Sequence, residues 1–452
     1  MQGIVGVYSK ENAVRKAINM LYGVQHRGQE SSGLTAAGDN SIRTWNDVGL
    51  VSKVFNEQFN PFIHPNDYLV ICSASGESTG HGKLPPINFV SENYTISLAI
   101  DGFVPNKSGL MSEEIFGPTL ISKLSHAPLE KALTETMHEM GSAYYSLVLA
   151  VHNSETEQSE LIVMRDRCGI RPLYIGYNDD ELFAASESAP FDLLESMGET
   201  LNVRRDVNPG TIIRRNEEGM SEIQVLDPTP AHCAFEWVYF GRPDSVIEGR
   251  TVHMVRKKLG HSLVNTHAMK DKTNDAVLIP VPDSGRSVCT GVAEALAVTA
   301  DEGVIKNAYL GRTYLINDPE YRKIASDLKH NIIKETIKGK KVIITDDSIV
   351  RGTVSESVAK NLLKAGATEV EFLVSYAPIY YPCFSDPPDK PLTAAPYKGK
   401  SLEEIGDLVA SRLPSINKVR YNSPKNIIDA IGLPSSTICT MCIDGKNPLK
   451  KK

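Results

Sequence analysis

The chain has 452 residues, which is enough for two or more domains with a hydrophobic core each. Its composition of 41% hydrophobic and 23% charged residues is that of a soluble globular protein, and the net charge of −7 gives no basic field that would attract nucleic acid. No apolar run approaches a membrane span, and the first residues begin no signal peptide, so we expect a cytoplasmic protein that binds neither nucleic acid nor membrane. In that compartment a cysteine serves as a thiol, a metal ligand or a nucleophile rather than in a disulfide.

The first predicted element is a short strand from Gly3 to Tyr8, followed by a helical stretch that ends near Leu21. A polar segment bounded by glycines, residues 23–33, comes next and predicts a loop. Much farther along, the proline-rich residues 227–230 break the pattern. We expect the domain boundary there, with one domain at residues 1–228 and a second at residues 229–452.

Two elements are predicted early in the second domain. Apolar residues at helical spacing indicate an amphipathic helix, and they are Val252, Val255, Leu259 and Leu263. Residues 276–280 then indicate a buried strand, which runs into residues 281–286. Small and polar groups at the carboxyl end of a strand suit a phosphate group.

The most informative stretch runs from Val342 to Ser355. It opens with a β-branched run typical of a buried parallel strand, continues with Asp346 and Asp347, and then passes through a loop of Ser, Arg, Gly and Thr. A helical pattern follows, with apolar residues on one face at Val354, Val358, Leu362 and Leu363. Such a loop before a helix N-terminus forms an anion site, because free backbone N–H groups and the helix dipole converge there.

An acidic pair just before an anion site does not itself bind phosphate. It suits ribose hydroxyls, or a Mg²⁺ ion that arrives with the ligand. We therefore expect a phosphorylated sugar, with Asp346 and Asp347 at the sugar and the following loop at its phosphate. For a lone Asp-Asp pair, an acidic strand end before an ordinary helix cap would be the better interpretation, but the whole string is more specific.

This string closely resembles the phosphoribosyl-pyrophosphate (PRPP) loop of type I phosphoribosyltransferases, and most closely that of the glutamine PRPP amidotransferase (amidophosphoribosyltransferase) family. Other segments resemble the same family, namely residues 23–33, 165–173, 185–188, 207–210 and 233–245. The resemblance implies a two-domain α+β/α/β fold. Residues 1–228 would form an Ntn-hydrolase-like αββα sandwich (a type 2 glutamine amidotransferase domain), and residues 229–452 a type I phosphoribosyltransferase α/β domain.

The resemblance also implies a set of PRPP-binding residues. Asp346 and Asp347 would hold the ribose hydroxyls, and the 5-phosphate would lie against Ser348, Ile349, Val350, Arg351, Gly352, Thr353 and Ser355. The pyrophosphate and its Mg²⁺ would face Asp283, Ser284, Arg286, Arg312 and Lys329, with the ion near Ser284, Asp346 and Asp347. Arg322 matches another basic position, whereas Asp327 stands where the family often has arginine. Without the resemblance, the better interpretation of Arg312, Arg322 and Lys329 would be a solvated helix face.

The sequence departs from the family at three positions of the glutaminase centre. Gln2 stands where such an enzyme needs the cysteine whose thiolate attacks the amide, and a carboxamide is no usable nucleophile. Ser75 stands where an arginine clamps the carboxylate of glutamine. Asp101 places an anion where a hydrogen-bond donor should meet a developing oxyanion. Three changes in one site predict that glutaminase activity is lost.

The pair Cys439 and Cys442 forms a C-x-x-C motif, which by itself is compatible with a zinc half-site, a redox pair or two buried thiols. Cys233 and Cys383 also stand where one branch of the family ligates a [4Fe–4S] cluster. Four thiolates suit such a cluster or tetrahedral zinc. The resemblance favours the cluster, in a structural role, and zinc stays as the alternative.

Our leading hypothesis is an amidophosphoribosyltransferase of de novo purine biosynthesis that forms 5-phosphoribosylamine from PRPP and ammonia not generated by its own glutaminase site. The ammonia, or another amine, would be free or would come from a partner such as a separate glutaminase. The alternative is a non-catalytic PRPP- or nucleotide-binding regulator of a partner enzyme, for example an active paralogue. The family is generally oligomeric, so a homo-oligomer is expected.

Overall fold

The computed structural model describes residues 1–38, 41–76, 83–105, 109–269, 276–307, 330–383 and 391–450. These residues form two compact units. Unit 1 contains residues 1–233, 245–249 and 448–450, and unit 2 contains residues 234–244 and 250–447. The chain therefore passes between the units more than once. The domain boundary expected at residue 228 stays a prediction.

Unit 1 contains two antiparallel sheets. The first has the strand order β11 (Val203–Asp206), β9 (Tyr174–Tyr177), β10 (Leu182–Ala185), β1 (Gln2–Tyr8), β4 (Leu69–Ser75), β2 (Ser31–Gly38), β3 (Ser41–Val48). The second has the order β13 (Gly219–Gln224), β12 (Thr211–Asn216), β8 (Gln158–Arg165), β7 (Tyr144–Asn153), β6 (Tyr94–Phe103), β5 (Ile87–Val90).

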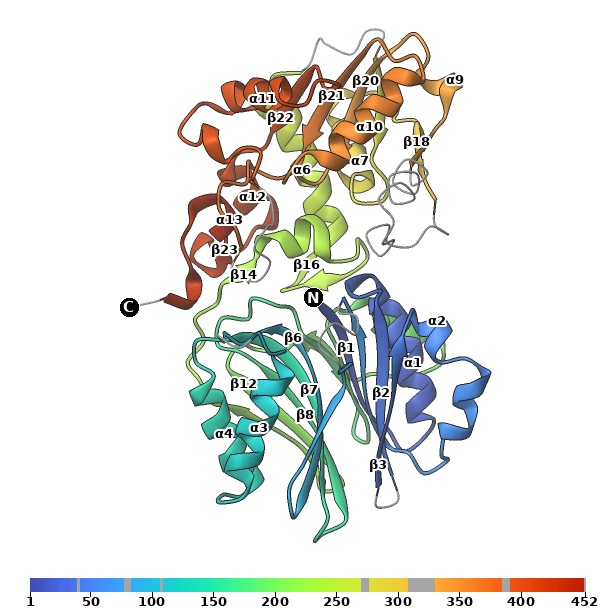
Figure 1. Ribbon diagram of the computed structural model, residues 1–452, viewed down its shortest axis with the longest axis vertical. Coiled ribbons are helices and arrows are strands. Elements are labelled where there is room, and N and C mark those ends of the chain that lie inside the picture. Colours follow the sequence, from blue (N-terminus) through green and yellow to red (C-terminus); the bar gives the residue numbers. More distant parts are fainter. Residues whose placement is uncertain are drawn as a thin grey trace. The chain divides into compact units, whose positions relative to one another are not determined.

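Helices cover the outer face of each sheet of unit 1 (Figure 1). The first sheet carries α1 (Ala13–Val24), η1 (Gln25–Arg27), α2 (Val51–Val54), η2 (Glu57–Phe62) and α5 (Ala189–Ser196), and the second carries α3 (Glu113–Leu124) and α4 (Leu129–Glu139). Two further short strands of unit 1 are β14 (His232–Cys233) and β15 (Val246–Ile247). The layers are helix, sheet, sheet and helix, so the expected αββα sandwich is confirmed.

Strand β1 shows why the amino-terminal segment is apolar throughout. Its side chains alternate between the two faces of the first sheet. Val5 and Val7 pack in the core beneath α1, whereas Ile4 and Tyr8 pack in the core between the two sheets. All seven residues of β1 are buried, because both faces of this central strand are covered.

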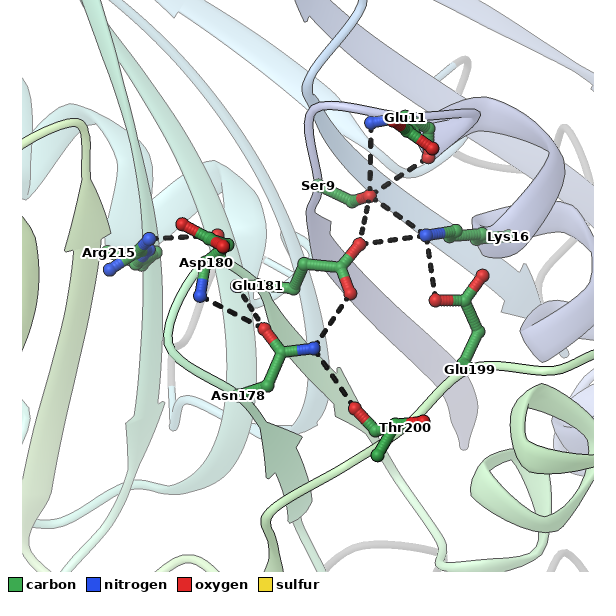
Figure 2. Close-up of polar contacts among 9 residues, drawn as sticks. All are labelled: Ser9, Glu11, Lys16, Asn178, Asp180, Glu181, Glu199, Thr200 and Arg215. Carbon is green, nitrogen blue, oxygen red and sulfur yellow. Dashed lines mark hydrogen bonds and ion pairs between the residues drawn. The ribbon is translucent and has the colours of Figure 1, made fainter.

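A partly buried ion network lies at the carboxyl end of β1 (Figure 2). The Lys16 ammonium donates to Ser9 Oγ at 3.1 Å, to Glu181 Oε1 at 2.8 Å and to Glu199 Oε2 at 2.9 Å. Asn178 then donates to Glu181 Oε2 at 3.0 Å. Burial alone would lower the pKa of Lys16, but the two glutamates raise it, so Lys16 is charged and joins α1 to the loops beside β9 and β10.

Unit 2 is built on a parallel sheet with the strand order β17 (Ala276–Pro280), β20 (Lys341–Asp346), β21 (Glu369–Val374), β22 (Lys418–Tyr421). One face carries α6 (Val252–Thr266) and α7 (Arg286–Leu296), and the other carries α10 (Thr353–Lys364) and α11 (Leu402–Ser411). In β20, Ile343 joins the core on the α6 side, while Val342 and Ile344 join the other core. The predicted α/β domain is confirmed.

Shorter elements complete unit 2. They are η4 (Glu236–Phe240), β16 (Arg250–Thr251), β18 (Val304–Lys306), β19 (His330–Ile332), α9 (Lys334–Ile337), η6 (Ala395–Tyr397), α12 (Pro424–Ile431), η7 (Ser435–Thr437), β23 (Ile438–Cys439) and α13 (Met441–Asp444). A last 3₁₀ helix, η8 (Pro448–Lys450), belongs to unit 1. In the described part of the chain, no helix is long and apolar enough to cross a membrane.

The predicted helix faces are largely confirmed. All four apolar residues expected on one face of α6 are buried. On α10, Val358 and Leu362 are buried, but Val354 is 58% exposed. Val354 lies in the first turn, before the helix reaches the core, so its place in the predicted apolar face was wrong.

Candidate functional site

Strand pairing brings the three altered positions of the amino-terminal site together. Gln2 lies opposite Ser75 in the register of β1 and β4, and the Gln2 backbone N–H donates to Asp101 Oδ1 of β6 at 3.1 Å. All three residues are buried. The structure therefore gathers at one place the three residues that the family resemblance assigned to one glutaminase centre.

The Gln2 carboxamide is hydrogen-bonded at both ends. Its Oε1 accepts from Ser73 Oγ at 2.9 Å, and its Nε2 donates to Glu113 Oε1 at 2.9 Å. Glu113 Oε1 also accepts the Ile100 N–H at 3.1 Å. Sequence reasoning missed Ser73 and Glu113, because nothing local marks them as partners of a residue 71 and 111 positions away.

Asp101 belongs to a buried ionic network that also contains Arg27 and Glu187. Arg27 donates to Asp101 Oδ2 at 2.9 Å and to Glu187 Oε1 at 2.8 Å, and all three side chains are fully buried. Burial alone would raise the pKa of Asp101, but Arg27 and Arg171 lower it. Burial would likewise raise the pKa of Glu187, which His26 and Arg27 lower. Both carboxylates are therefore charged and paired. We call Gln2, Ser73, Asp101, Glu113, Arg27 and Glu187 the amino-terminal network.

A close backbone approach places Arg27 in this network. The residue after it, Gly28, packs so tightly against β4 that an added Cβ would lie 2.2 Å from the Ala74 carbonyl oxygen. Only glycine fits there, which lets η1 turn back against the strand that carries Ser73 and Ser75. The network thus combines a carboxamide that is no nucleophile with charges that are already matched by protein partners.

A second centre lies at the carboxyl ends of β17 and β20 in unit 2. These neighbouring parallel strands end in Pro280 and Asp346, so the loops that follow them start at the same sheet edge. Thr345 Oγ1 donates to the Gly285 carbonyl at 3.0 Å, and Ser284 is hydrogen-bonded to the Asp346 side chain. The structure therefore brings together Ser284 and Asp346, two of the residues expected near Mg²⁺.

Asp346 and Asp347 form a buried acidic pair. The Asp347 N–H donates to Asp346 Oδ1 at 2.9 Å, and Ser348 Oγ donates to Asp347 Oδ2 at 2.5 Å. Burial first, and then the like charge of Asp347, raise the pKa of Asp346 well above its usual range. Within the described part of the chain, neither carboxylate has an ion pair with a basic side chain. A cation or hydroxyl groups supplied by a ligand would relieve this repulsion.

The loop from Ser348 to Gly352 leads to the N-terminus of α10. Gly352 has φ +77°, a conformation that favours glycine, and an added Cβ would lie 2.7 Å from Leu413 Cδ2. No side chain caps α10, so the N–H groups of its first turn, at Thr353, Val354 and Ser355, lack intrahelical partners. A phosphate suits this position.

Not every residue predicted in this loop offers a side chain. Ile349 is 2% exposed and packs in the core with Leu413, so only its backbone can reach a ligand. The Val350 carbonyl accepts the Thr393 N–H at 2.9 Å. Ser355 is buried, whereas Arg351 and Thr353 are exposed.

The residues expected at the pyrophosphate side are engaged with one another. Asp283 lies 3.6 Å from Arg286 and 3.2 Å from Lys306, and Arg286 also pairs with Glu302 at 2.8 Å. Lys306, which sequence reasoning missed, lies at the end of β18. Arg312, Arg322, Asp327 and Lys329 lie outside the described residues.

The four cysteines expected to hold a cluster are divided between the units, with Cys233 in unit 1 and the others in unit 2. Burial raises the pKa of Cys439 to about 12 and that of Cys442 to about 11. Cys442 Sγ lies 3.2 Å from the Tyr376 hydroxyl. Across the described ranges, no three His, Cys, Asp or Glu side chains are arranged to hold a metal ion. The [4Fe–4S] cluster and the zinc alternative therefore stay predictions.

Nearly the whole chain is similar in sequence to known proteins. No family model matches. The chain is 34% identical to the amidophosphoribosyltransferase of Methanothermobacter thermautotrophicus, over 99% of this chain and 94% of that protein. It is 30% identical to the Bacillus subtilis amidophosphoribosyltransferase, again over 99% and 94%.

Two solved structures agree with these relatives. One is described as the allosteric regulatory enzyme of purine biosynthesis, with TM-score 0.83, 28% identity, and coverage of 99% of this chain and 96% of that one. The other is the glutamine PRPP amidotransferase from B. subtilis in complex with ADP and GMP, with TM-score 0.81, 28% identity and coverage of 99% and 97%. The two units, the acidic pair before the α10 loop and the full-length likeness lead to one conclusion: the chain belongs to the amidophosphoribosyltransferase family.

Proposed function

We propose that this protein forms 5-phosphoribosylamine from PRPP with ammonia that its own amino-terminal site does not generate. One observation carries the proposal. The residue at the nucleophile position, Gln2, is a carboxamide whose two polar ends bond to Ser73 and Glu113, inside a buried network of matched charges. Glutaminase chemistry needs a nucleophile and a vacant donor for the oxyanion. The acidic pair in unit 2 has no such internal match, which supports a transferase half that still takes its ligand.

The proposed reaction is a displacement at the ribose carbon that bears the pyrophosphate. Ammonia forms the new C–N bond, the C–O bond breaks, the pyrophosphate leaves with the electron pair, and the added nitrogen gives up a proton. Asp346 and Asp347 would hold the ribose hydroxyls, and the first turn of α10 would hold the 5-phosphate. Neutral ammonia needs little general base, so positioning and charge carry the catalysis.

The pyrophosphate side would use Ser284 and Arg286, with Arg312 and Lys329 from the segment outside the described residues. Arg286 would exchange Glu302 for the pyrophosphate. Mg²⁺ fits the buried acidic pair and the Ser284 hydroxyl, since it favours oxygen ligands and usually arrives with substrate phosphates. When bound, it would neutralise the departing pyrophosphate.

We infer further that the ammonia is free or comes from a separate glutaminase, and that the protein works as a cytoplasmic homo-oligomer. The [4Fe–4S] cluster stays a prediction, and no step of the proposed reaction depends on it.

The test is pyrophosphate release from PRPP and Mg²⁺ by anaerobically purified protein, with ammonia in one reaction and glutamine in another. Release with ammonia alone is the expected result. An Asp346→Asn preparation, purified in the same way, serves as the control for a contaminating amidotransferase. Release with glutamine would contradict the proposal. Saturable PRPP binding without release in either reaction would replace it with the regulator.

A further inference from the structure

A five-residue segment, Ser245–Gly249, belongs to unit 1 although the residues on both sides of it belong to unit 2. We call it the docked segment. It is not held by apolar contact alone. Ile247 is 2% exposed, but both ends of the segment bind buried charged groups of unit 1.

The amino-terminal end of the docked segment binds Glu187, which is a member of the amino-terminal network. Ser245 Oγ donates to Glu187 Oε2 at 2.6 Å, and both residues are fully buried. The Val246 N–H donates to Ser188 Oγ at 2.7 Å. Glu187 uses its other oxygen for His26 at 2.7 Å and for Arg27 at 2.8 Å. One carboxylate therefore serves both the network and the docked segment.

The other end binds a separate charged cluster. Glu248 pairs with Arg165 at 2.7 Å and lies 3.4 Å from His232 Nδ1. The Glu248 and Gly249 N–H groups donate to the Asp206 carboxyl. Glu248 has φ +48°, which costs a non-glycine residue energy, so contacts must maintain that backbone.

An unbroken series of bonds connects the old nucleophile position with the docked segment. The Gln2 N–H binds Asp101, Asp101 binds Arg27, Arg27 binds Glu187, and Glu187 binds Ser245. Removing one member takes one bond away from the next buried group, which weakens the series at that point.

The chain leaves the docked segment directly into the transferase unit. Within three residues of Gly249 it begins α6, whose second residue, His253, has Nδ1 2.9 Å from Ser287 Oγ. Ser287 is the second residue of α7, next to Arg286 and three residues after Ser284. The start of α6 is thus bonded to the segment that carries the pyrophosphate-side residues.

We propose that the amino-terminal network has become an anchor for the docked segment, and that it positions the start of α6 and, through His253 and Ser287, the pyrophosphate loop. Glu187, Ser245, His253 and Ser287 are positioning residues in this account. None of them needs to contact PRPP. The inference rests on the proposed function, because it assigns to the altered site a role in the transferase reaction.

The main test is Ser245→Ala, which removes the bond to Glu187 without introducing charge. We expect hydrogen–deuterium exchange at residues 245–249 to rise about tenfold, and the Kd for PRPP with Mg²⁺ to rise about fivefold with kcat nearly unchanged. Ser159→Ala is the matched control. Ser159 is also a buried serine of unit 1, and its hydroxyl lies 3.0 Å from His152 Nδ1, outside the network.

A second variant tests the far end of the path. Ser287→Ala should raise the Kd for PRPP by a similar factor while exchange at residues 245–249 stays at the wild-type level. Unchanged exchange in Ser245→Ala, or raised exchange with an unchanged Kd, would overturn the anchor. Wild-type protein that binds no PRPP would overturn the proposed function and the anchor with it. Wild-type protein that binds PRPP without turnover would overturn only the proposed function. Hydrogen–deuterium exchange and the Kd for PRPP would still report on the anchor.

Discussion

Two buried acidic sites in this protein have opposite electrostatic states. In the amino-terminal network, Asp101 and Glu187 are fully buried, yet Arg27 and Arg171 lower the pKa of Asp101, and His26 and Arg27 lower that of Glu187. In the acidic pair of unit 2, Asp346 is buried to a similar degree, and burial first, and then the like charge of Asp347, raise its pKa. The first site is neutralised by the protein itself. The second leaves a charge that a ligand can neutralise.

Under the proposed function, this difference explains how the amino-terminal site would lose its chemistry while the acidic pair of unit 2 would keep a binding function. A site whose donors and charges are matched internally gains little from a ligand, which would have to break those bonds first. A site with two repelling carboxylates gains from Mg²⁺ or from hydroxyl groups. Removing a carboxylate from the amino-terminal network should therefore lower stability. Removing one from the acidic pair of unit 2 should weaken ligand binding without lowering stability.

The largest expected effect is on PRPP binding in Asp346→Asn. The amide removes a carboxylate that, under the proposed function, would hold the ribose hydroxyls and Mg²⁺, so the Kd should rise roughly 100-fold, or about 3 kcal/mol. The melting temperature without ligand should stay equal or rise, because the repulsion with Asp347 is gone. Asp407→Asn, at an exposed position of α11, is the control and should change neither value. A large loss of stability in Asp346→Asn would mean that the pair is structural.

The second expected effect is on the stability of unit 1 in Asp101→Asn. Arg27 and Arg171 lose a charged partner where water cannot reach them, so the free energy of unfolding should fall by about 3 kcal/mol. Asp192→Asn breaks the exposed pair with Arg204 and should cost less than about 1 kcal/mol. Urea titration measures both. Equal losses in the two variants would show that the network is not the tightly paired core of unit 1.

The third effect is a pH dependence of opposite sign in the two units. Glu187 and Asp101 have lowered folded pKa values, so their stabilisation is present above about pH 4 and is lost as the pH falls further. Asp346 has a raised folded pKa, so unit 2 should instead lose stability as the pH rises above about 4. Each group can contribute at most about 1.4 kcal/mol per pH unit.

The chain's two tryptophans separate these signals, since Trp45 lies in unit 1 and Trp237 in unit 2. Trp237→Phe leaves a fluorescence probe in unit 1, and Trp45→Phe leaves one in unit 2. Unfolding followed at several pH values should give slopes of opposite sign. The slope in unit 2 should vanish when Asp346→Asn is added, and a slope that persists would assign the effect to another group.

The smallest effect is expected in the ion network of Figure 2. Glu181→Gln leaves Lys16 its pair with Glu199, and the side chains of Lys16 and Glu181 are 8% and 15% exposed, so water reaches both. The free energy of unfolding should fall by about 1 kcal/mol, less than in Asp101→Asn. A fall in the free energy of unfolding as large as that in Asp101→Asn would show that partial exposure to water does not reduce the cost of removing a paired charge.

Much of the architecture was predictable because local patterns specify it. The apolar run of β20 and the helical spacing of α6 predict elements whose faces are buried as expected. The string from Asp346 to Ser355 predicts a strand end, a loop and a helix start, and the structure has all three. Gln2, Ser75 and Asp101 were expected together through the family resemblance, not through their spacing.

The remainder depends on strand register and tertiary contact. No sequence rule connects Gln2 with Glu113, or Ser245 with Glu187, because each bond joins elements distant in the chain. The apolar spacing that placed Val354 on the buried face did not show that this side chain is exposed in the first turn of α10. Likewise, the pairing of Arg286 with Glu302 depends on the position of the loop before β18.

The most direct test of the comparison is to titrate one preparation of the wild-type protein with PRPP and Mg²⁺, and then with glutamine, by isothermal calorimetry. The account predicts saturable heat with PRPP and Mg²⁺ and none with glutamine. Saturable binding of glutamine would contradict it, since the internally matched site would then still accept the ligand it is said to have lost.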